Sequence, residues 1–306
     1  MLDFSRYPPI FRFSGMFAIK SGAQFASALV AKNAMAQTQL RLSSAVSTSY
    51  RKTRELASVG SEHESPSLVI FDKDGTLLCF HTMWIPWIHH AAQSIENSTG
   101  LSVFPNIAQA LGLCLVENKV KPGLLAEGTT SQIAHEISTI LMDNGIKSFE
   151  ARELAISSLA TSNDQIIANE LVKELSDTVA LFTRLKQHGT KIAVCTADNR
   201  KSSLLALKRM NVDHMVDMVV CGDDKNTVPK PSPHNALKIC QYLNVEPSKA
   251  IMVGDTRVDM EMAHNAELGA AVGVLSGIGC KDHLHRADIL LDHVGHLVNV
   301  FYETRI

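Results

Sequence analysis

The chain has 306 residues, a formal net charge of −2 and a hydrophobic fraction of 45%, which is enough apolar material for a globular protein of one or two domains. The balanced charge argues against nucleic-acid binding, and no apolar stretch reaches the roughly 18 to 20 residues that span a bilayer. The six cysteines are scattered, without a CxxC pair or a Cys/His array of zinc spacing. We therefore expect reduced and mostly buried thiols.

The first 54 residues are basic, with eight lysines and arginines against the single acid Asp3. They are also rich in Ser and Ala, a composition typical of mitochondrial transit peptides. The alternatives are a disordered tail and a secretory signal, whose apolar run at 25–31 would be cut short by Lys20 and Lys32. We expect a leader over residues 1–65 and a location in the mitochondrial matrix, with the cytoplasm as the alternative.

Short apolar runs and segments of helical period alternate through much of the remaining chain. The run at 68–71 has no polar alternation, which indicates a strand buried on both faces, as in a parallel sheet. Similar runs recur at 191–195, 218–221, 250–253 and 271–274, with helical periods between them at 202–210, 234–243 and 259–267. This alternation predicts an α/β fold whose core is a doubly wound, Rossmann-like parallel sheet.

The interval 79–174 departs from this alternation, because its apolar residues recur at helical spacing and β-branched runs are almost absent. We expect an inserted α-helical cap domain here, and a core made of residues 66–78 and 175–306. Helices are expected at 83–95, 130–142 and 166–173, with a turn at 126–130 between two of them.

Two carboxylates, Asp72 and Asp74, follow the first expected strand directly, in the sequence DKDGT. Ligands of open α/β sheets bind at this carboxyl edge. Hydrolysis through a covalent intermediate needs a nucleophile and a separate acid and base, and two aspartates can divide these roles. An Asp-rich strand end followed by Gly is also common in ordinary turns, so this motif alone leaves catalysis and a turn equally open.

Two further polar groups follow the next strands. Thr196, after the strand at 191–195, can bind a phosphate oxygen, although Thr196, Asp198 or Asn199 could equally cap the next helix. Lys230 lies in the sequence VPKPSP, where three prolines restrict the backbone around one ammonium. A fixed cation of this kind suits a phosphoryl group attacked by a carboxylate, whereas most lysines are solvated surface charges.

Asp255 and Asp259, in the sequence GDTRVD, follow the strand at 250–253. Together with Asp72 they would gather like charges, which is costly unless a cation is bound, and oxygen ligands suit Mg²⁺. Asp259 could also cap the following helix.

The four motifs DKDGT, VCTAD, PKPSP and VGDTRVD, in this order after successive strands, resemble the haloacid dehalogenase superfamily over residues 67–290. The resemblance implies a nucleophile at Asp72 and a general acid and base at Asp74. It implies that Thr196 and Lys230 hold the phosphate, and that Asp255, the Asp72 carboxylate and the Asp74 carbonyl bind Mg²⁺, supported by Asp259. Lys73 is a departure, since an apolar residue is common between the two aspartates in this family.

Within the family that the chain resembles, the presence of Asp74 implies phosphate-ester hydrolysis through an aspartyl-phosphate. The alternatives are a phosphomutase or phosphotransferase, and a catalytically silent binding module. The long interval between Thr76 and Thr196 can hold a cap, which implies a small phosphorylated metabolite as the substrate. The pattern, including the later Gly273–Gly277, resembles phosphoglycolate phosphatases with a helical cap. No oligomeric state is predicted.

Cap residues that could read the substrate include His81, Trp84, Trp87, His89 and His90. For these side chains we favour packing under the cap over ligand binding.

Overall fold

The computed structural model describes residues 65–168 and 172–302. The leader expected at 1–65 lies outside this part except for its last residue, so its targeting role stays a prediction. Among the described residues, no helix combines the length and the apolar character that crossing a membrane requires.

The core is a six-stranded sheet in the order β5-β4-β1-β6-β7-β8. All of its strand pairs are parallel. Its central strand β1 pairs with β4 on one side and with β6 on the other, so that Leu68 lies beside both Lys191 and Ala250. The strands are β1 (Leu68–Phe71), β4 (Lys191–Cys195), β5 (Met218–Val220), β6 (Ala250–Gly254), β7 (Ala270–Val274) and β8 (Ile289–Leu291).

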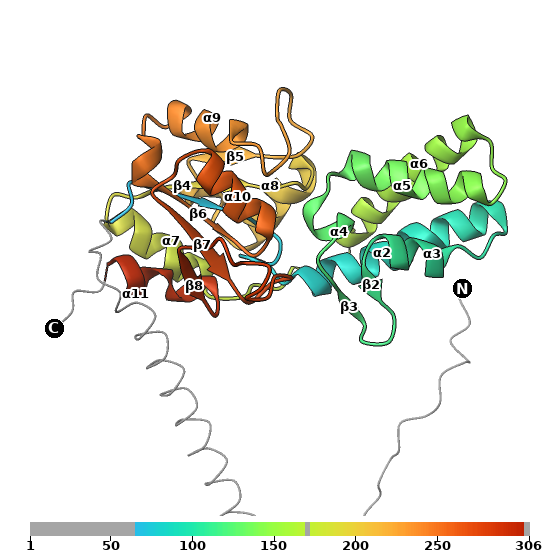
Figure 1. Cartoon of the computed structure of the whole chain (residues 1–306), viewed down its shortest axis with the longest axis horizontal. Helices are drawn as coiled ribbons and strands as arrows, with labels where there is room; N and C mark the ends of the chain where they lie inside the picture. The colour runs from blue at the N-terminus through green and yellow to red at the C-terminus, as the bar shows by residue number, and fades with distance from the viewer. Residues whose placement is uncertain (1–64, 169–171, 303–306) are drawn as a thin grey trace, which may run out of the picture. The chain divides into compact units, whose positions relative to one another are not determined.

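Alternate residues of β1 enter two separate apolar clusters, one on each face of the sheet. Val69 and Phe71 pack with residues of α7 (Thr178–Gln187), α8 (Arg200–Arg209) and α11 (Leu297–Phe301). Leu68 and Ile70 pack with α9 (His234–Tyr242) and α10 (Arg257–Asn265). In Figure 1, α9 lies above the sheet, and α7 and α11 lie below it. The expected doubly wound parallel-sheet core is confirmed.

The segment between β1 and α7 is mostly helical, as expected for an inserted cap, and its helices are drawn from cyan to yellow-green in Figure 1. It also contains a small antiparallel hairpin that the sequence analysis did not predict. The elements are α2 (Phe80–Thr99), α3 (Phe104–Ala110), β2 (Leu113–Cys114), β3 (Lys119–Val120), α4 (Leu124–Glu127), α5 (Thr130–Asp143) and α6 (Ser148–Ala168).

The expected helix at 166–173 was wrong: α6 begins at Ser148 and ends at Ala168, and residues 172–173 are not helical. Part of the buried face of α6 consists of small residues, Ala151, Ala155, Ser158 and Ser162. These residues have helical spacing, but Ala and Ser are small and only weakly hydrophobic. A search for apolar residues at helical spacing therefore did not detect this helix.

The chain leaves the core and returns to it through two segments that are hydrogen-bonded to each other. The Cys79 N–H donates to the Lys173 carbonyl at 2.8 Å, and the Leu175 N–H donates to the Leu77 carbonyl at 3.0 Å. This pairing supports our proposed boundaries of 79 and 174 for the cap.

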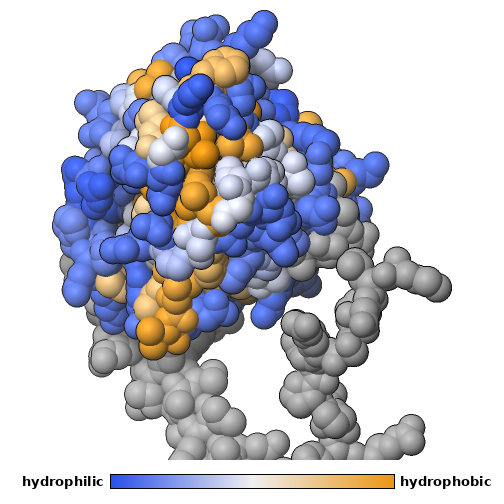
Figure 2. Space-filling view, turned by 90° about the vertical axis from the view of Figure 1, so that its right-hand side faces the viewer, coloured by the Kyte–Doolittle hydropathy of each residue, from blue (hydrophilic) through white to orange (hydrophobic). Residues whose placement is uncertain are grey.

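On the outside of the cap, Figure 2 shows apolar side chains in a band among polar ones. The exposed large apolar residues of the cap are Leu115, Val116, Met142, Phe149 and Ile156.

Candidate active site

The polar residues that follow β1, β4 and β6 meet at the carboxyl edge of the sheet, because these three strands are neighbours. Asp72 follows β1, and its N–H donates to the Val253 carbonyl of β6 at 2.8 Å. Asp72, Asp255 and Asp259 are buried, and one carboxylate oxygen of each lies within 4.8 Å of the others. The structure thus brings together three of the predicted site residues from distant parts of the sequence.

Lys230 joins two of these carboxylates. Its Nζ lies 2.6 Å from Asp72 Oδ1 and 2.6 Å from Asp259 Oδ1, and its side chain is buried. Burial by itself lowers the pKa of Lys230, but the charges of Asp259 and Asp72 raise it above its ordinary value overall. Lys230 is therefore a cation at any physiological pH, and the alternative of a solvated surface lysine is excluded.

The loop that carries Lys230 is held from both sides. Asn235 donates from Nδ2 to the Val228 carbonyl at 2.9 Å, and Asn265 donates from Nδ2 to the Pro231 carbonyl at 2.9 Å. These bonds fix the backbone before and after the lysine, so the ammonium has a defined position.

The sequence left open whether Asp259 supports the site or caps the following helix, and in the structure its carboxylate makes both kinds of contact. Its Oδ2 accepts from the Thr256 N–H at 3.1 Å and from the Thr256 hydroxyl at 2.5 Å, which caps the first turn of α10. Its other oxygen holds Lys230. One carboxylate therefore both starts the helix and positions the cation.

Asp255 is completely buried, and its carboxylate accepts hydrogen bonds from the Ile278 N–H at 2.8 Å and from the Thr76 hydroxyl at 3.3 Å. A Cβ atom at Gly75 would lie 2.2 Å from Asp255 Oδ2, and one at Gly277 would lie 2.0 Å from the same oxygen. Only glycine fits at these two positions. The sequence analysis did not predict this contact, because it joins loops about 200 residues apart.

The cluster carries more negative than positive charge. Burial, together with the charges of Asp72 and Asp259, raises the pKa of Asp255 well above its ordinary value. Burial also raises the pKa of Asp72 to about 7, although Lys230 acts in the opposite direction. The cluster has three carboxylates and one ammonium, which contacts only Asp72 and Asp259, so these buried oxygens suit a hard divalent cation such as Mg²⁺.

Asp74 lies beside this cluster, but its carboxylate has a different partner, Lys73. The Lys73 ammonium lies 2.7 Å from Asp74 Oδ2 and 3.0 Å from Asp198 Oδ2, and the Lys73 side chain is fully buried. Burial lowers the pKa of Lys73, but the charges of Asp198 and Asp74 raise it above its ordinary value overall. The sequence analysis noted Lys73 as a departure from the family pattern and assigned it no role.

Thr196 is buried, and its hydroxyl accepts from the Asp198 N–H at 3.2 Å. The capping alternative for Thr196 is excluded, because Asn199 caps α8 by accepting from the Ser202 N–H at 2.9 Å. Thr196 instead lines a pocket that also contains Asp72 and Lys230.

The cap covers this edge of the sheet with the 126–130 turn. As expected, this turn connects two cap helices, α4 and α5, and Thr129 forms a capping box with Gln132 at the start of α5. Ala126, Glu127 and Thr129 line the pocket of Lys230. Ala126, Gly128 and Thr130 line a second pocket, which contains Asp72, Asp74 and Trp84.

Three of the aromatic residues of α2 differ in their surroundings. Trp87 is buried and donates from Nε1 to Asn163 of α6 at 2.7 Å, which is the packing role that we favoured. His89 stacks on Phe104 with ring centroids 4.6 Å apart, but it is exposed. Trp84 differs from them, because it faces the second pocket and its indole N–H has no hydrogen-bond partner among the described residues.

Comparison with known proteins identifies the same family that the four sequence motifs resemble. A family model described as a haloacid dehalogenase-like hydrolase matches residues 66–267. Among curated proteins, the pyrophosphatases PpaX of Bacillus thuringiensis (strain Al Hakam) and of Bacillus cereus (strain Q1) are each 31% identical over 134 residues. These matches cover 43% of this chain and 61% of each relative, so the chain spans less than two thirds of their length.

Solved structures share the fold. A predicted phosphoglycolate phosphatase from Haemophilus somnus 129PT superposes with a TM-score of 0.58 at 17% identity, covering 79% of this chain and 99% of the other. A beta-phosphoglucomutase from Clostridium difficile superposes with a TM-score of 0.52 at 19% identity, covering 76% and 93%. At these identities, the likeness establishes the fold alone.

Proposed function

The chain belongs to the haloacid dehalogenase-like hydrolases, and from this premise we propose that it is a magnesium-dependent phosphatase. In this proposal, it hydrolyses a small phosphate monoester through an aspartyl-phosphate on Asp72. The observation that carries the proposal is the buried contact of Asp72 with Lys230 at 2.6 Å, beside the fully buried Asp255. A nucleophile, a cation for the phosphoryl oxygens and an excess of buried carboxylates are thus within reach of one another.

In the first step, a carboxylate oxygen of Asp72 forms a bond to phosphorus while the bond from phosphorus to the ester oxygen breaks. Lys230 and the Thr196 hydroxyl bind the phosphoryl oxygens, and the ammonium offsets the repulsion between them and Asp72. This role agrees with the raised pKa of Lys230, which keeps the side chain charged.

Asp74 donates a proton to the leaving oxygen and then accepts one from the water that cleaves the aspartyl-phosphate. Burial raises the pKa of Asp74, with Lys73 opposing this effect, so the carboxyl group can hold the proton that it must donate. Its carboxylate points to Lys73 and lies outside the cluster of Asp72, Asp255 and Asp259.

The Asp72 carboxylate, the Asp74 carbonyl and Asp255 would hold Mg²⁺, with Asp259 as support through Lys230. The bound ion supplies positive charge to the phosphate oxygens during transfer. The hydrogen bonds from Ile278 and Thr76 orient the Asp255 carboxylate for this role.

The test is release of phosphate from p-nitrophenyl phosphate and from a panel of small esters that includes phosphoglycolate, in Mg²⁺ and in EDTA. We expect turnover in Mg²⁺, none in EDTA, and none from Asp72→Asn. Asp143→Asn, at the exposed end of α5, is the matched control and keeps full activity. A folded wild-type protein that releases no phosphate from any ester would refute a phosphatase.

The same measurement separates the alternatives. A phosphomutase would transfer the phosphoryl group to a second hydroxyl, so phosphate release would stall without an acceptor sugar. A silent binding module would bind an ester without cleaving it in either condition.

A further inference from the structure

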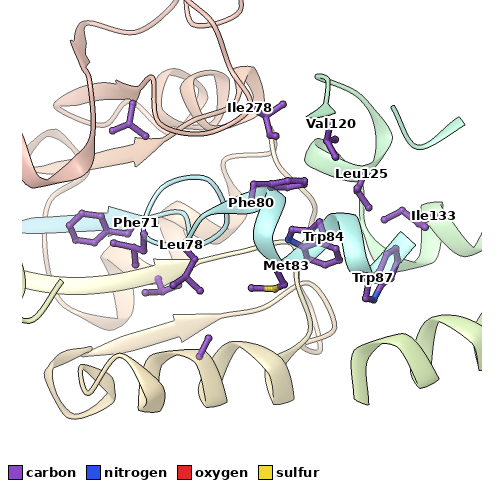
Figure 3. Close-up of a cluster of buried hydrophobic side chains, with 14 of the residues drawn as sticks. Phe71, Leu78, Phe80, Met83, Trp84, Trp87, Val120, Leu125, Ile133 and Ile278 are labelled. Carbon is purple, nitrogen blue, oxygen red and sulfur yellow. The ribbon is translucent and has the colours of Figure 1, made fainter. Parts of the chain in front are cut away.

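The second pocket, on the Asp74 side of the site, is walled by the cap. Phe80 and Trp84 of α2, Leu125 of α4 and Ile133 of α5 form its apolar walls, and Asp72, Asp74 and Thr196 reach it from the core. Figure 3 shows Phe80, Trp84, Leu125 and Ile133 gathered where the cap meets the end of β1. The pocket therefore has an acidic floor and an apolar roof.

The position of Asp74 determines which part of a substrate this pocket would receive. Lys230 lines the other pocket, so the phosphoryl group belongs near Thr196 and Lys230. Asp74, the proposed proton donor to the leaving oxygen, lines the second pocket. The alcohol part of the ester then extends beneath the cap helices.

Trp84 provides a hydrogen-bond donor in this pocket. Its side chain is 9% exposed, and its indole N–H makes no hydrogen bond to a described residue, although the Asp74 carboxylate is the nearest protein acceptor in this pocket. A buried donor without an acceptor is costly, and a ligand that supplies an acceptor removes this cost.

No arginine, lysine or histidine lines this pocket in the part of the chain that the structure describes. The cation beside it, Lys73, is fully buried and contacts both Asp74 and Asp198. In the neighbouring pocket, the cap contributes an acid, Glu127, which pairs with Arg257 at 3.5 Å. A negatively charged leaving group would lose its hydration next to these carboxylates and gain no ion pair.

We propose that the second pocket binds an uncharged leaving alcohol with a small apolar body and one hydrogen-bond acceptor, and that Trp84 selects it through its N–H. This inference rests on the proposed phosphatase function and narrows its substrate class. It disfavours phosphoglycolate and inorganic pyrophosphate, whose leaving groups carry negative charge.

The test compares kcat/KM for small phosphate esters and for pyrophosphate, a phosphoric anhydride. These are 2-hydroxyethyl phosphate, with an uncharged hydroxyl, ethyl phosphate, with no acceptor, and phosphoglycolate and pyrophosphate, with anionic leaving groups. We expect 2-hydroxyethyl phosphate to exceed both anionic substrates at least tenfold. A preference for either anionic substrate, in an enzyme that does cleave p-nitrophenyl phosphate, overturns the inference and leaves the phosphatase intact. Failure to cleave any ester overturns both.

Trp84→Phe keeps most of the ring and removes the N–H. We expect kcat/KM for 2-hydroxyethyl phosphate to fall about tenfold, as for loss of one hydrogen bond, while the value for ethyl phosphate stays within about twofold. An equal fall for both esters would mean that Trp84 acts on Asp74 and not on the substrate, which overturns the assignment. Trp87→Phe, one helical turn away, is the control that changes no substrate ratio, since its N–H is bonded to Asn163. The nitrogens of the two tryptophans point in different directions in Figure 3.

Thr130→Lys adds the missing cation at a partly exposed position in the wall, so it does not depend on the folding of a core variant. It should raise kcat/KM for phosphoglycolate relative to 2-hydroxyethyl phosphate at least tenfold. An unchanged ratio would contradict the role given to this pocket.

Discussion

Lys73 is a fully buried cation that contacts two carboxylates, Asp74 and Asp198. Burying three charges costs free energy, and only their mutual contacts offset this cost. The contact with Asp198 links the end of β1 to the start of the β4–α8 loop. The contact with Asp74 holds the carboxylate of the proposed acid apart from the Asp72, Asp255 and Asp259 cluster. Lys73 lines neither pocket, so in the proposed mechanism it positions Asp74 without contacting the substrate.

Replacing Lys73 by Met leaves two buried carboxylates without their shared cation. We expect the free energy of unfolding, measured by urea denaturation, to fall by about 3 to 5 kcal/mol. The double variant Lys73→Met with Asp198→Asn removes one of the two unpaired charges, so it should recover part of this loss. An equal or larger loss in the double variant would show that Asp198 and Lys73 contribute independently.

At the residue scale, the sequence analysis selected Asp72, Thr196, Lys230, Asp255 and Asp259 because each lies near the end of a strand in a parallel sheet. It could not assign Lys73, because a lysine in a loop between two aspartates is equally compatible with an exposed ion pair. Only the folded structure shows that the Lys73 side chain is fully buried and enclosed by Asp74 and Asp198.

At the element scale, the loops after β1 and after β7 pack on the Asp255 carboxylate through two glycines. Gly75 has a φ of +89°, which other residues adopt only with strain, and it also lacks room for a Cβ atom. Gly145, at the end of a cap helix, has a φ of +88°, and a Cβ atom at this position would meet no other atom within 4 Å. The two positions differ in the space available and have the same backbone conformation.

Gly145→Ala should therefore cost only the backbone strain, about 1 to 2 kcal/mol in the free energy of unfolding, with activity unchanged. Gly75→Ala should lower the free energy of unfolding by a larger amount than Gly145→Ala. It should also lower metal-dependent turnover more than tenfold, because the new methyl group displaces Asp255. Chemical denaturation and phosphate release on both variants check this. Equal effects at the two positions would mean that the contact with Asp255 is unimportant.

Elements were predicted well where one physical signal dominated. Strands β1, β4, β6 and β7 are almost entirely buried, so they are continuous apolar runs, and the structure has strands at each predicted run. The edge strand β8 is only partly buried, and it was not predicted. The face of α6 that contains Ala151, Ala155, Ser158 and Ser162 gave no such signal, and the two-residue strands of the hairpin at Leu113–Cys114 and Lys119–Val120 are too short to show a period.

At the scale of the whole molecule, the excess of buried carboxylates connects stability, pH and metal binding. A carboxyl group whose pKa is raised in the folded state stabilises the fold fully below its ordinary pKa, and this contribution is lost as the pH rises through the folded-state value. For Asp72 this loss occurs over the pH interval from 3.8 to about 7, and the pKa of Asp255 is also raised. The proposed Mg²⁺ would bind the deprotonated carboxylates, so adding it should restore the stability that is lost at high pH.

We therefore expect the rise in Tm caused by Mg²⁺ to be larger at pH 8 than at pH 5.5. Asp255→Asn removes one of the repelling charges and one of the proposed ligands. Both the rise in Tm caused by Mg²⁺ and the pH dependence of this rise should therefore be smaller. Differential scanning fluorimetry in Mg²⁺ and EDTA measures this. A Mg²⁺ shift that is equal at the two pH values, or that persists in Asp255→Asn, would place the metal elsewhere.

The order of motifs and the long interval before Thr196 were sufficient to predict a parallel-sheet core with an inserted, mostly helical segment, although not each of its elements. The substrate could not be predicted in the same way. It depends on which side chains of α2, α4 and α5 the folded cap turns toward Asp74, and sequence spacing alone did not distinguish the inward Trp84 from the packed Trp87.

The central claim is that Asp72 becomes phosphorylated during turnover, and trapping this species is its most direct test. Asp74→Asn should slow cleavage of the intermediate, so acid quenching of this variant with p-nitrophenyl phosphate and Mg²⁺, followed by peptide mass spectrometry, should find phosphate on Asp72. Wild-type protein quenched in EDTA should show none. Phosphate on another residue, or continued turnover by Asp72→Asn, would contradict the account.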